Sequence, residues 1–236
     1  MCSCLFNVHL YFRARYRILT IWSTIASIVL TTFEPPRKRT RIQAQNEARI
    51  IAAALDVFSA NGYRGSTVDQ IAASAGMSKA NILYYFNRKQ EIYTAVLQRT
   101  LTVWLDPLDE LDADGEPIEQ LWKYAQRKLQ LSREAPQASR LFANEILQGG
   151  PIIKPFLETE LRALVSNKCQ IIQSWIDAGK LAQVAPLHLI FMIWSVTQHY
   201  ADFDTQIKAL TGAVDDKMYA DAEQTLKLIL TRGLQP

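Results

Sequence analysis

Hydrophobic positions recur at spacings of three and four along most of the chain, which is the pattern of amphipathic helices. Over residues 43–60, Ile50 and Phe58 belong to one apolar helical face, and Asn61-Gly62 follows as a stop signal. Alternating polar and apolar runs, the mark of strands, are scarce. The pattern therefore predicts an all-α fold.

A short helix is predicted next, over residues 68–75, and Gly76 should end it. The sequence offers two alternative N-terminal capping pairs, Ser66 with Asp69 or Thr67 with Gln70.

Ser78 can cap a further short helix, with Met77 and Ile82 placed as a hydrophobic staple across its start. Ile82, Leu83 and Phe86 are expected to be buried on one side of this helix. Two short helices around a tight glycine turn predict a helix-turn-helix motif.

A longer helix is predicted over residues 88–110, and Pro107 should kink it or end it early. The fold class is then all-α with nine helices, three in a front domain over 43–90 and six in a back domain over 91–236. The remaining predicted helices are 118–134, one ended by Gly149-Gly150, 156–178, one opened by Pro186, and 216–232.

The charge of the chain is divided unevenly, although the net charge is only +3. Residues 37–99 carry ten Lys or Arg against four acidic residues, whereas residues 100–236 carry thirteen against eighteen. A basic front segment joined to an acidic body indicates that the front meets a polyanion. Solvated basic faces are also common, so charge alone does not decide the point.

Residues 1–42 form an N-terminal extension, in which residues 18–33 carry no charge and follow Arg13, Arg15 and Arg17. This is the layout of a signal or anchor segment, but a spanning helix needs roughly 20 apolar residues. Three alternatives stay open: a start assigned too early or a disordered extension, a membrane-associated helix, or an ordered part of the fold. Residues 34–42 are interpreted as a basic arm.

The second helix of a helix-turn-helix enters the major groove with its first residues on the base edges. Lys79 and Asn81 occupy that first turn, and the Tyr85 hydroxyl and Lys89 can reach phosphates. The alternative is a capped helical hairpin with solvated lysines. The full set of candidate DNA-binding residues is Arg64, Thr67, Ser78, Lys79, Asn81, Tyr84, Tyr85 and Lys89.

The stretch "GYRGSTVDQIAASAGMSKANILYYFNRKQEIY", residues 62–93, resembles the signature of TetR-family transcriptional regulators. The back-domain stretches "TVWLDPLDEL", "SREAPQASRLFANEILQGGPI" and "LIFMIWSVTQHYADF" resemble members of this family that regulate pyrimidine utilisation. The resemblance implies a homodimeric regulator of the repressor type that binds a palindromic double-stranded DNA operator. It also implies a small-molecule effector, uracil or thymine, and no cofactor.

A pocket for a flat pyrimidine needs apolar walls and a few aimed polar groups. Trp194 and Gln198 are four residues apart and share a helical face, and the Gln198 amide offers both a donor and an acceptor. Aromatic residues at helical spacing can equally be core, and the last two helices can instead pack against a second copy. The candidate effector residues are Trp104, Leu105, Trp122, Phe142, Trp194 and Gln198.

The sequence contains no nucleophile elbow, phosphate loop or HExxH motif, so we expect no enzyme. A helical hydrolase using His199 and Asp202 is the alternative from another class, although these two side chains can also form a structural hydrogen-bonded pair. The cysteines, Cys2, Cys4 and Cys169, show neither a disulfide framework nor zinc-site spacing, which favours a reduced cytoplasmic compartment. We expect Cys169 to be an inert core thiol.

Overall fold

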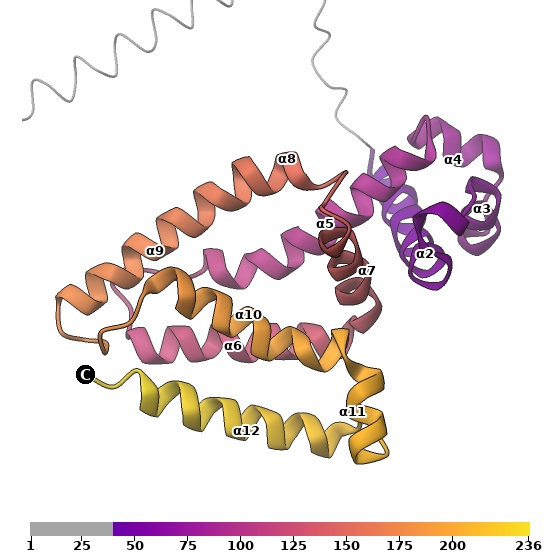
Figure 1. Ribbon diagram of the computed structural model, residues 1–236. Coiled ribbons are helices and arrows are strands. Elements are labelled where there is room, and N and C mark those ends of the chain that lie inside the picture. Colours follow the sequence, from indigo (N-terminus) through magenta and orange to yellow (C-terminus); the bar gives the residue numbers. More distant parts are fainter. Residues whose placement is uncertain (1–39) are drawn as a thin grey trace, which may run out of the picture. The chain divides into compact units, whose positions relative to one another are not determined.

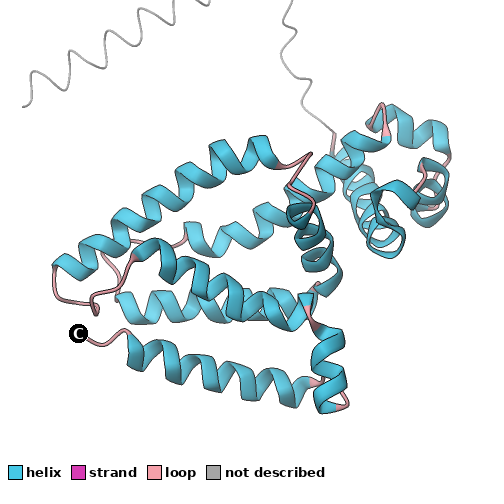
Figure 2. Cartoon of the chain, in the orientation of Figure 1, coloured by secondary structure: helices cyan, strands magenta, loops and turns pink. Residues whose placement is uncertain are grey.

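The computed structural model describes residues 40–236, whose regular elements are all helices (Figures 1 and 2). This confirms the all-α prediction. Residues 45–236 form one compact unit. The apolar run at 18–33 and most of the basic arm at 34–42 lie outside the described residues. Between residues 40 and 236 no helix is both long and apolar enough to cross a bilayer.

The front of the described chain consists of α2 (Arg41–Gly65), α3 (Val68–Ala75) and α4 (Lys79–Tyr85). Helix α2 starts inside the predicted basic arm, before the expected residue 43. Near its end Gly62 has φ 68° and ψ 170°, outside the helical range, so the predicted stop signal does break the helix. A core of fully buried side chains joins the three helices: Ile50, Ala54, Phe58, Ile71 and Ile82.

Helix α5 (Lys89–Asp109) belongs to two hydrophobic cores. Ile92, Val96 and Leu97 pack in the front core, whereas Leu108 packs in the back core. The helix runs past Pro107 to Asp109, close to the predicted end at 110, so of the two effects expected of Pro107 the early end does not occur. Buried Lys168 stabilises the C-terminal end, because its Nζ donates to the Asp109 carbonyl at 2.6 Å.

The back core collects buried side chains from α5, α6, α9, α10 and α12, with Leu121, Trp175 and Ile190 among them. Helix α6 lies beside both α10 and α12 (Figure 1). The helices of this part are α6 (Pro117–Glu134), α7 (Pro136–Leu147), α8 (Lys154–Phe156), a π-helical segment (Leu157–Leu161) that continues into α9 (Arg162–Asp177), α10 (Pro186–Asp202), α11 (Asp204–Thr211) and α12 (Asp216–Gly233).

The predicted count of nine helices is too low for residues 40–236, because α11 is a helix of its own. The chain leaves the helical conformation at Phe203, with φ −116° and ψ 29°, and starts again at Asp204. No glycine or proline stands at this break, so the sequence pattern does not signal it. The overall arrangement, a three-helix front followed by a helical back domain, is as predicted.

Candidate DNA-binding surface and effector site

Local capping fixes the geometry of the two short front helices. Thr67, not Ser66, caps α3: the Gln70 amide donates to Thr67 Oγ1 at 3.2 Å, and Gln70 Oε1 accepts from the Thr67 amide at 2.8 Å. Ser66 is buried, and its hydroxyl donates to the Gly62 carbonyl at 2.6 Å. This settles the choice between the two capping pairs that the sequence left open.

The turn between α3 and α4 depends on Gly76, which has φ 60° in the left-handed region. A Cβ at this position would lie 2.6 Å from Arg49 Nη2, but this end of a flexible side chain can move aside, so the left-handed backbone is what favours glycine here. After the turn, Ser78 Oγ accepts from the Asn81 amide at 3.1 Å and starts α4, as predicted. The Thr67 cap of α3, the left-handed turn at Gly76 and the Ser78 cap of α4 together define a helix-turn-helix.

One side of α4 is committed to the front core. Ile82 is fully buried and Phe86 is nearly so. Leu83, which the sequence analysis also placed in the core, is exposed. Ile82 and Phe86, four residues apart, point into the core, and Leu83 projects about 100° away from Ile82 at the edge of this face.

The exposed side chains of α4 include Lys79, Asn81 and Tyr84. The Tyr84 side chain is 70% exposed, which is unusual for so large an aromatic. Lys79 Nζ lies 2.9 Å from Asp69 Oδ2 in an exposed ion pair between α4 and α3. The first turn of α4 therefore presents an exposed cation and an exposed amide, and Tyr84 adds an exposed aromatic side chain one turn further on.

Two residues predicted to reach phosphates have partners inside the fold. Tyr85 is half-buried, and its hydroxyl accepts from Asn46 Nδ2 at 3.0 Å. Lys89 Nζ donates to the carbonyls of Tyr63 at 2.7 Å and Ser66 at 2.8 Å. Both side chains orient the helix-turn-helix, and any role on DNA would be additional to these bonds.

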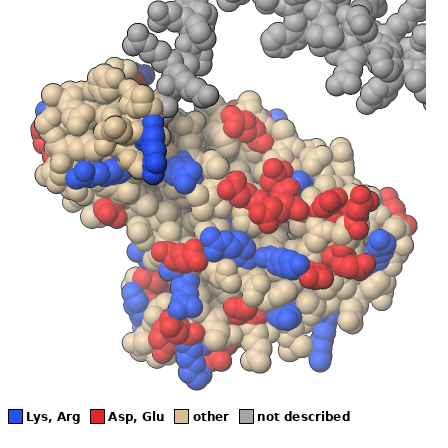
Figure 3. All heavy atoms as spheres, turned by 180° about the vertical axis from the view of Figure 1, so that it is seen from behind, with Lys and Arg blue, Asp and Glu red and all other residues tan. Residues whose placement is uncertain are grey.

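The other candidates of the front also have defined positions. Thr67 is exposed at the start of α3, Ser78 is occupied as the cap of α4, and Arg64 is exposed in the last turn of α2. On the face shown in Figure 3 the acidic side chains gather mainly over the back domain. This distribution agrees with the charge division along the sequence.

In the back domain the structure brings together two of the predicted effector residues. The rings of Trp104 on α5 and Phe142 on α7 meet edge to face, with centroids 6.1 Å apart. Leu105, the next residue on α5, is half-buried. Trp104 is buried, and its ring face is covered by the ammonium of Lys128 from α6, whose Nζ lies 4.2 Å from the centroid.

Trp194 and Gln198 lie on α10, which packs along α6. The Trp194 indole N–H donates to the hydroxyl of Tyr124, so this tryptophan holds α10 on α6. One turn further along both helices come Gln198, which is half-buried, and Lys128. Within residues 40–236 the Gln198 amide has no hydrogen-bond partner in the protein.

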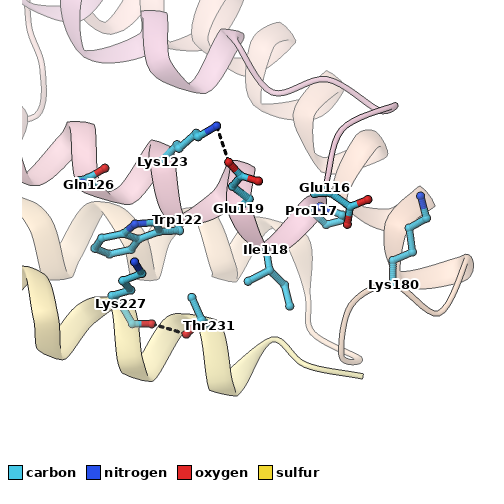
Figure 4. A pocket seen from close by; sticks show the side chains of 10 residues that line it. All are labelled: Glu116, Pro117, Ile118, Glu119, Trp122, Lys123, Gln126, Lys180, Lys227 and Thr231. Carbon is cyan, nitrogen blue, oxygen red and sulfur yellow. Dashed lines mark hydrogen bonds and ion pairs between the residues drawn. The ribbon is translucent and has the colours of Figure 1, made fainter.

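Trp122 lies elsewhere. It is on another face of α6 from Lys128 and borders a groove of about 900 Å³ between α6 and α12, where Lys227 Nζ lies 5.6 Å from its ring centroid (Figure 4). Ile118 and Thr231 face the same groove (Figure 4). The structure therefore does not join Trp122 to the Trp104 cluster.

Sequence reasoning missed Lys128, which is only 4% exposed. Its position was visible in the sequence, because Leu121, Tyr124, Ala125 and Lys128 follow the spacing of one apolar helical face. A lysine on such a face is rare in a core and indicates a specific role.

Asp202 on α10 accepts a hydrogen bond from the Ser139 hydroxyl of α7. Burial raises the pKa of Asp202, while the Ser139 hydrogen bond and the positive charge of Lys128 oppose that rise. His199 is exposed and stacks on Phe203 with ring centroids 5.0 Å apart. Among the described residues no hydrogen bond joins His199 and Asp202, and Asp202 pairs with Ser139 instead.

Cys169 is half-buried, and burial raises the pKa of its thiol. A raised pKa lowers the fraction of reactive thiolate. The prediction of an inert thiol agrees with this environment.

The fold and the exposed recognition helix define a class of helix-turn-helix DNA-binding proteins with a helical C-terminal domain. Residues 50–96 match the profile "Bacterial regulatory proteins, tetR family", and residues 97–236 match "YcdC-like protein, C-terminal region". The chain belongs to the TetR family of transcriptional regulators.

Within this family the chain is similar to the HTH-type transcriptional regulator RutR of Escherichia coli strain K12. The two are 43% identical over 201 residues, which cover 84% of this chain and 95% of RutR. The HTH-type transcriptional repressor NicS of Pseudomonas putida is 26% identical over 180 residues, covering 69% of this chain and 81% of NicS.

Among solved structures, a TetR-like transcriptional regulator from Rhodococcus sp. RHA1 superimposes with a TM-score of 0.58. The sequences are 21% identical, and the match covers 83% of this chain and 98% of that one. At this identity the likeness concerns the fold alone.

Proposed function

We propose that this DNA-binding regulator is a homodimeric repressor that binds a palindromic operator and releases it when uracil or thymine binds the back domain. The observation that carries the proposal is the 43% identity to RutR across 84% of the chain, the back domain included. It agrees with the sequence resemblance to regulators of pyrimidine utilisation. The proposal that the protein represses transcription is supported by its similarity to the repressor NicS.

A second copy of the chain fits the exposed apolar side chains of α10 and α12. Both helices carry large hydrophobic residues that are more than a third exposed. Such patches on helices of one domain are typical of protein interfaces. These residues are Leu187, Phe191 and Met192 on α10, and Leu228 and Ile229 on α12.

In a dimer the two α4 helices must meet major grooves about one helical turn, roughly 34–36 Å, apart. Helix α5 belongs to both cores, and it contacts α7 twice: its Tyr93 hydroxyl donates to buried Glu145 at 3.2 Å, and its Trp104 packs on Phe142. An effector that displaces α5 or α7 would therefore change the spacing of the two α4 helices. Such a shift requires that the effector bind the two spacings with different affinity.

For the effector site we propose the region around Trp104, Leu105, Phe142 and Gln198. Gln198 can pair with a lactam edge, because an amide offers a donor beside an acceptor. Trp194 supports α10 from one turn away through Tyr124. The location of Trp122 on a separate face of α6 argues for leaving it out.

The proposal is tested with an operator selected from random duplex DNA and followed by fluorescence anisotropy. Uracil and thymine should release the operator, whereas cytosine, which lacks the imide N–H, should not. The Gln198→Ala protein should need about tenfold more uracil for half-release, because a hydrogen bond is worth about 0.5–1.5 kcal/mol. Gln206→Ala, an exposed change on α11, is the matched control. Retention of the operator at saturating uracil and thymine would refute the pyrimidine assignment.

A further inference from the structure

Lys128 is a buried ammonium without a protein acceptor. Within residues 40–236 its Nζ makes no hydrogen bond and no ion pair, and its contact is with the ring of Trp104 at 4.2 Å. Every fully shielded side-chain nitrogen or oxygen of this part of the chain has a hydrogen-bond partner. The unbonded Lys128 Nζ is therefore not fully shielded from solvent.

Three helices other than its own α6 supply the groups around this ammonium. Helix α5 supplies the Trp104 face, α10 supplies the carboxylate of Asp202, and α7 supplies Ser139, which donates to Asp202 Oδ1. Asp202 Oδ2 has no donor among the described residues. The Lys128 ammonium on α6 and the Asp202 carboxylate on α10 thus attract each other electrostatically. Both groups can still form further hydrogen bonds.

The charge state of Lys128 reflects the same environment. Burial lowers the pKa of its ammonium to about 7, and the negative charge of Asp202 opposes that fall. Burying an unpaired charge destabilises a fold. Such a residue is expected where binding, not stability, requires it.

We infer that Lys128 anchors the effector by donating to a ring carbonyl, while Asp202 accepts from the adjacent ring N–H. The ligand class is a planar cyclic amide or imide, in which a carbonyl stands beside an N–H. The inference deepens the proposed function and rests on its placement of the effector in the back domain.

This anchor links effector binding to protons. A carbonyl bound to the ammonium favours the charged form, so the pKa of Lys128 rises in the complex. Below about pH 7 Lys128 is already charged and the affinity does not change with pH. Above pH 7 binding takes up a proton, and the affinity falls as the pH rises. Two other charged groups act electrostatically on Asp202, namely Arg140 on α7 and His199 on α10. The His199→Gln protein therefore serves as a control for titration of the imidazole.

The test uses isothermal titration of the whole chain with uracil at pH 6.0 to 8.5, in buffers of different ionisation enthalpy. Wild type and His199→Gln should take up protons at pH 8. Lys128→Met, which keeps the length of the side chain, should take up none and bind at least about tenfold more weakly. Uracil binding by Lys128→Met with wild-type affinity and proton uptake would overturn the inference.

Thermal unfolding without effector separates this role from a structural one. Lys128→Met should unfold at a higher temperature than wild type, because it replaces an unpaired buried charge with an apolar side chain of similar volume. A lower midpoint would identify Lys128 as a residue kept for the fold and would overturn the inference.

If wild type binds neither uracil nor thymine, the pyrimidine assignment fails, and the anchor is tested by a thermal-shift screen of other cyclic amides, imides and lactams. Compounds that stabilise wild type should lose this effect on Lys128→Met. Equal stabilisation of both proteins by every such compound, or stabilisation of wild type by none, would overturn the inference.

Discussion

Replacing Lys79 with Ala should weaken operator binding by about 10- to 100-fold in the dimer. Lys79 is in the first turn of α4, and each copy of the chain would lose one contact worth about 0.7–1.4 kcal/mol. Its exposed ion pair with Asp69 does not withhold it from DNA, because such pairs contribute only about 0–1 kcal/mol. Fluorescence anisotropy with the selected operator measures the change.

The salt dependence of the same titration identifies the kind of contact. If each Lys79 neutralises one phosphate, the slope of log K against log salt should become less steep by about 0.9 for each lost contact. Lys123→Ala is the matched control, because Lys123 forms a similar exposed pair with Glu119 on α6 at 2.7 Å. Equal affinities of the Lys79→Ala and Lys123→Ala proteins would remove Lys79 from the interface.

Replacing Phe58 with Ala should destabilise the protein by about 3–5 kcal/mol. Phe58 is fully buried in the front core, and its ring meets that of Tyr93 on α5 edge to face with centroids 5.0 Å apart. The substitution leaves a cavity where α2 packs on the connecting helix. Urea unfolding followed by circular dichroism, at one protein concentration, should show a lower midpoint.

Two comparisons make this result specific. Phe58→Leu fills most of the space and should lose much less stability. Tyr84→Ala removes an aromatic side chain of similar size that is 70% exposed, and should leave the midpoint nearly unchanged. A midpoint for Phe58→Ala equal to that of Tyr84→Ala would show that the front core is not built around Phe58.

The sequence predicted the helix-turn-helix well because its signals are local. Thr67, Gly76 and Ser78 each act on residues no more than a few positions away, and the structure shows the capping bonds and the left-handed turn at these positions. The separate helix α11 could not be predicted in the same way, because the break at Phe203 carries no glycine or proline. Leu83 was misplaced because a short helix gives too few apolar residues to fix its inward direction.

The effector region was predicted less completely because it depends on contacts between distant helices. Trp104 and Phe142 do meet, but Trp194 is engaged with Tyr124 and Trp122 faces a different groove. The unpaired state of Lys128 depends on what α5, α7 and α10 place around it. Spacing along α6 can show that a lysine occupies an apolar face, but it cannot show whether a hydrogen-bond acceptor from another helix lies beside that lysine.

The account depends most on the exposed residues in the first turn of α4 reading the operator. The direct measurement is to select operators from random duplex DNA with wild type and with Asn81→Arg, an exposed change in the first turn of α4. Asparagine favours adenine and arginine favours guanine in the major groove. The preferred base should therefore change at one symmetric position in each half-site. Identical base preferences at every position, with unchanged affinity, would contradict the account.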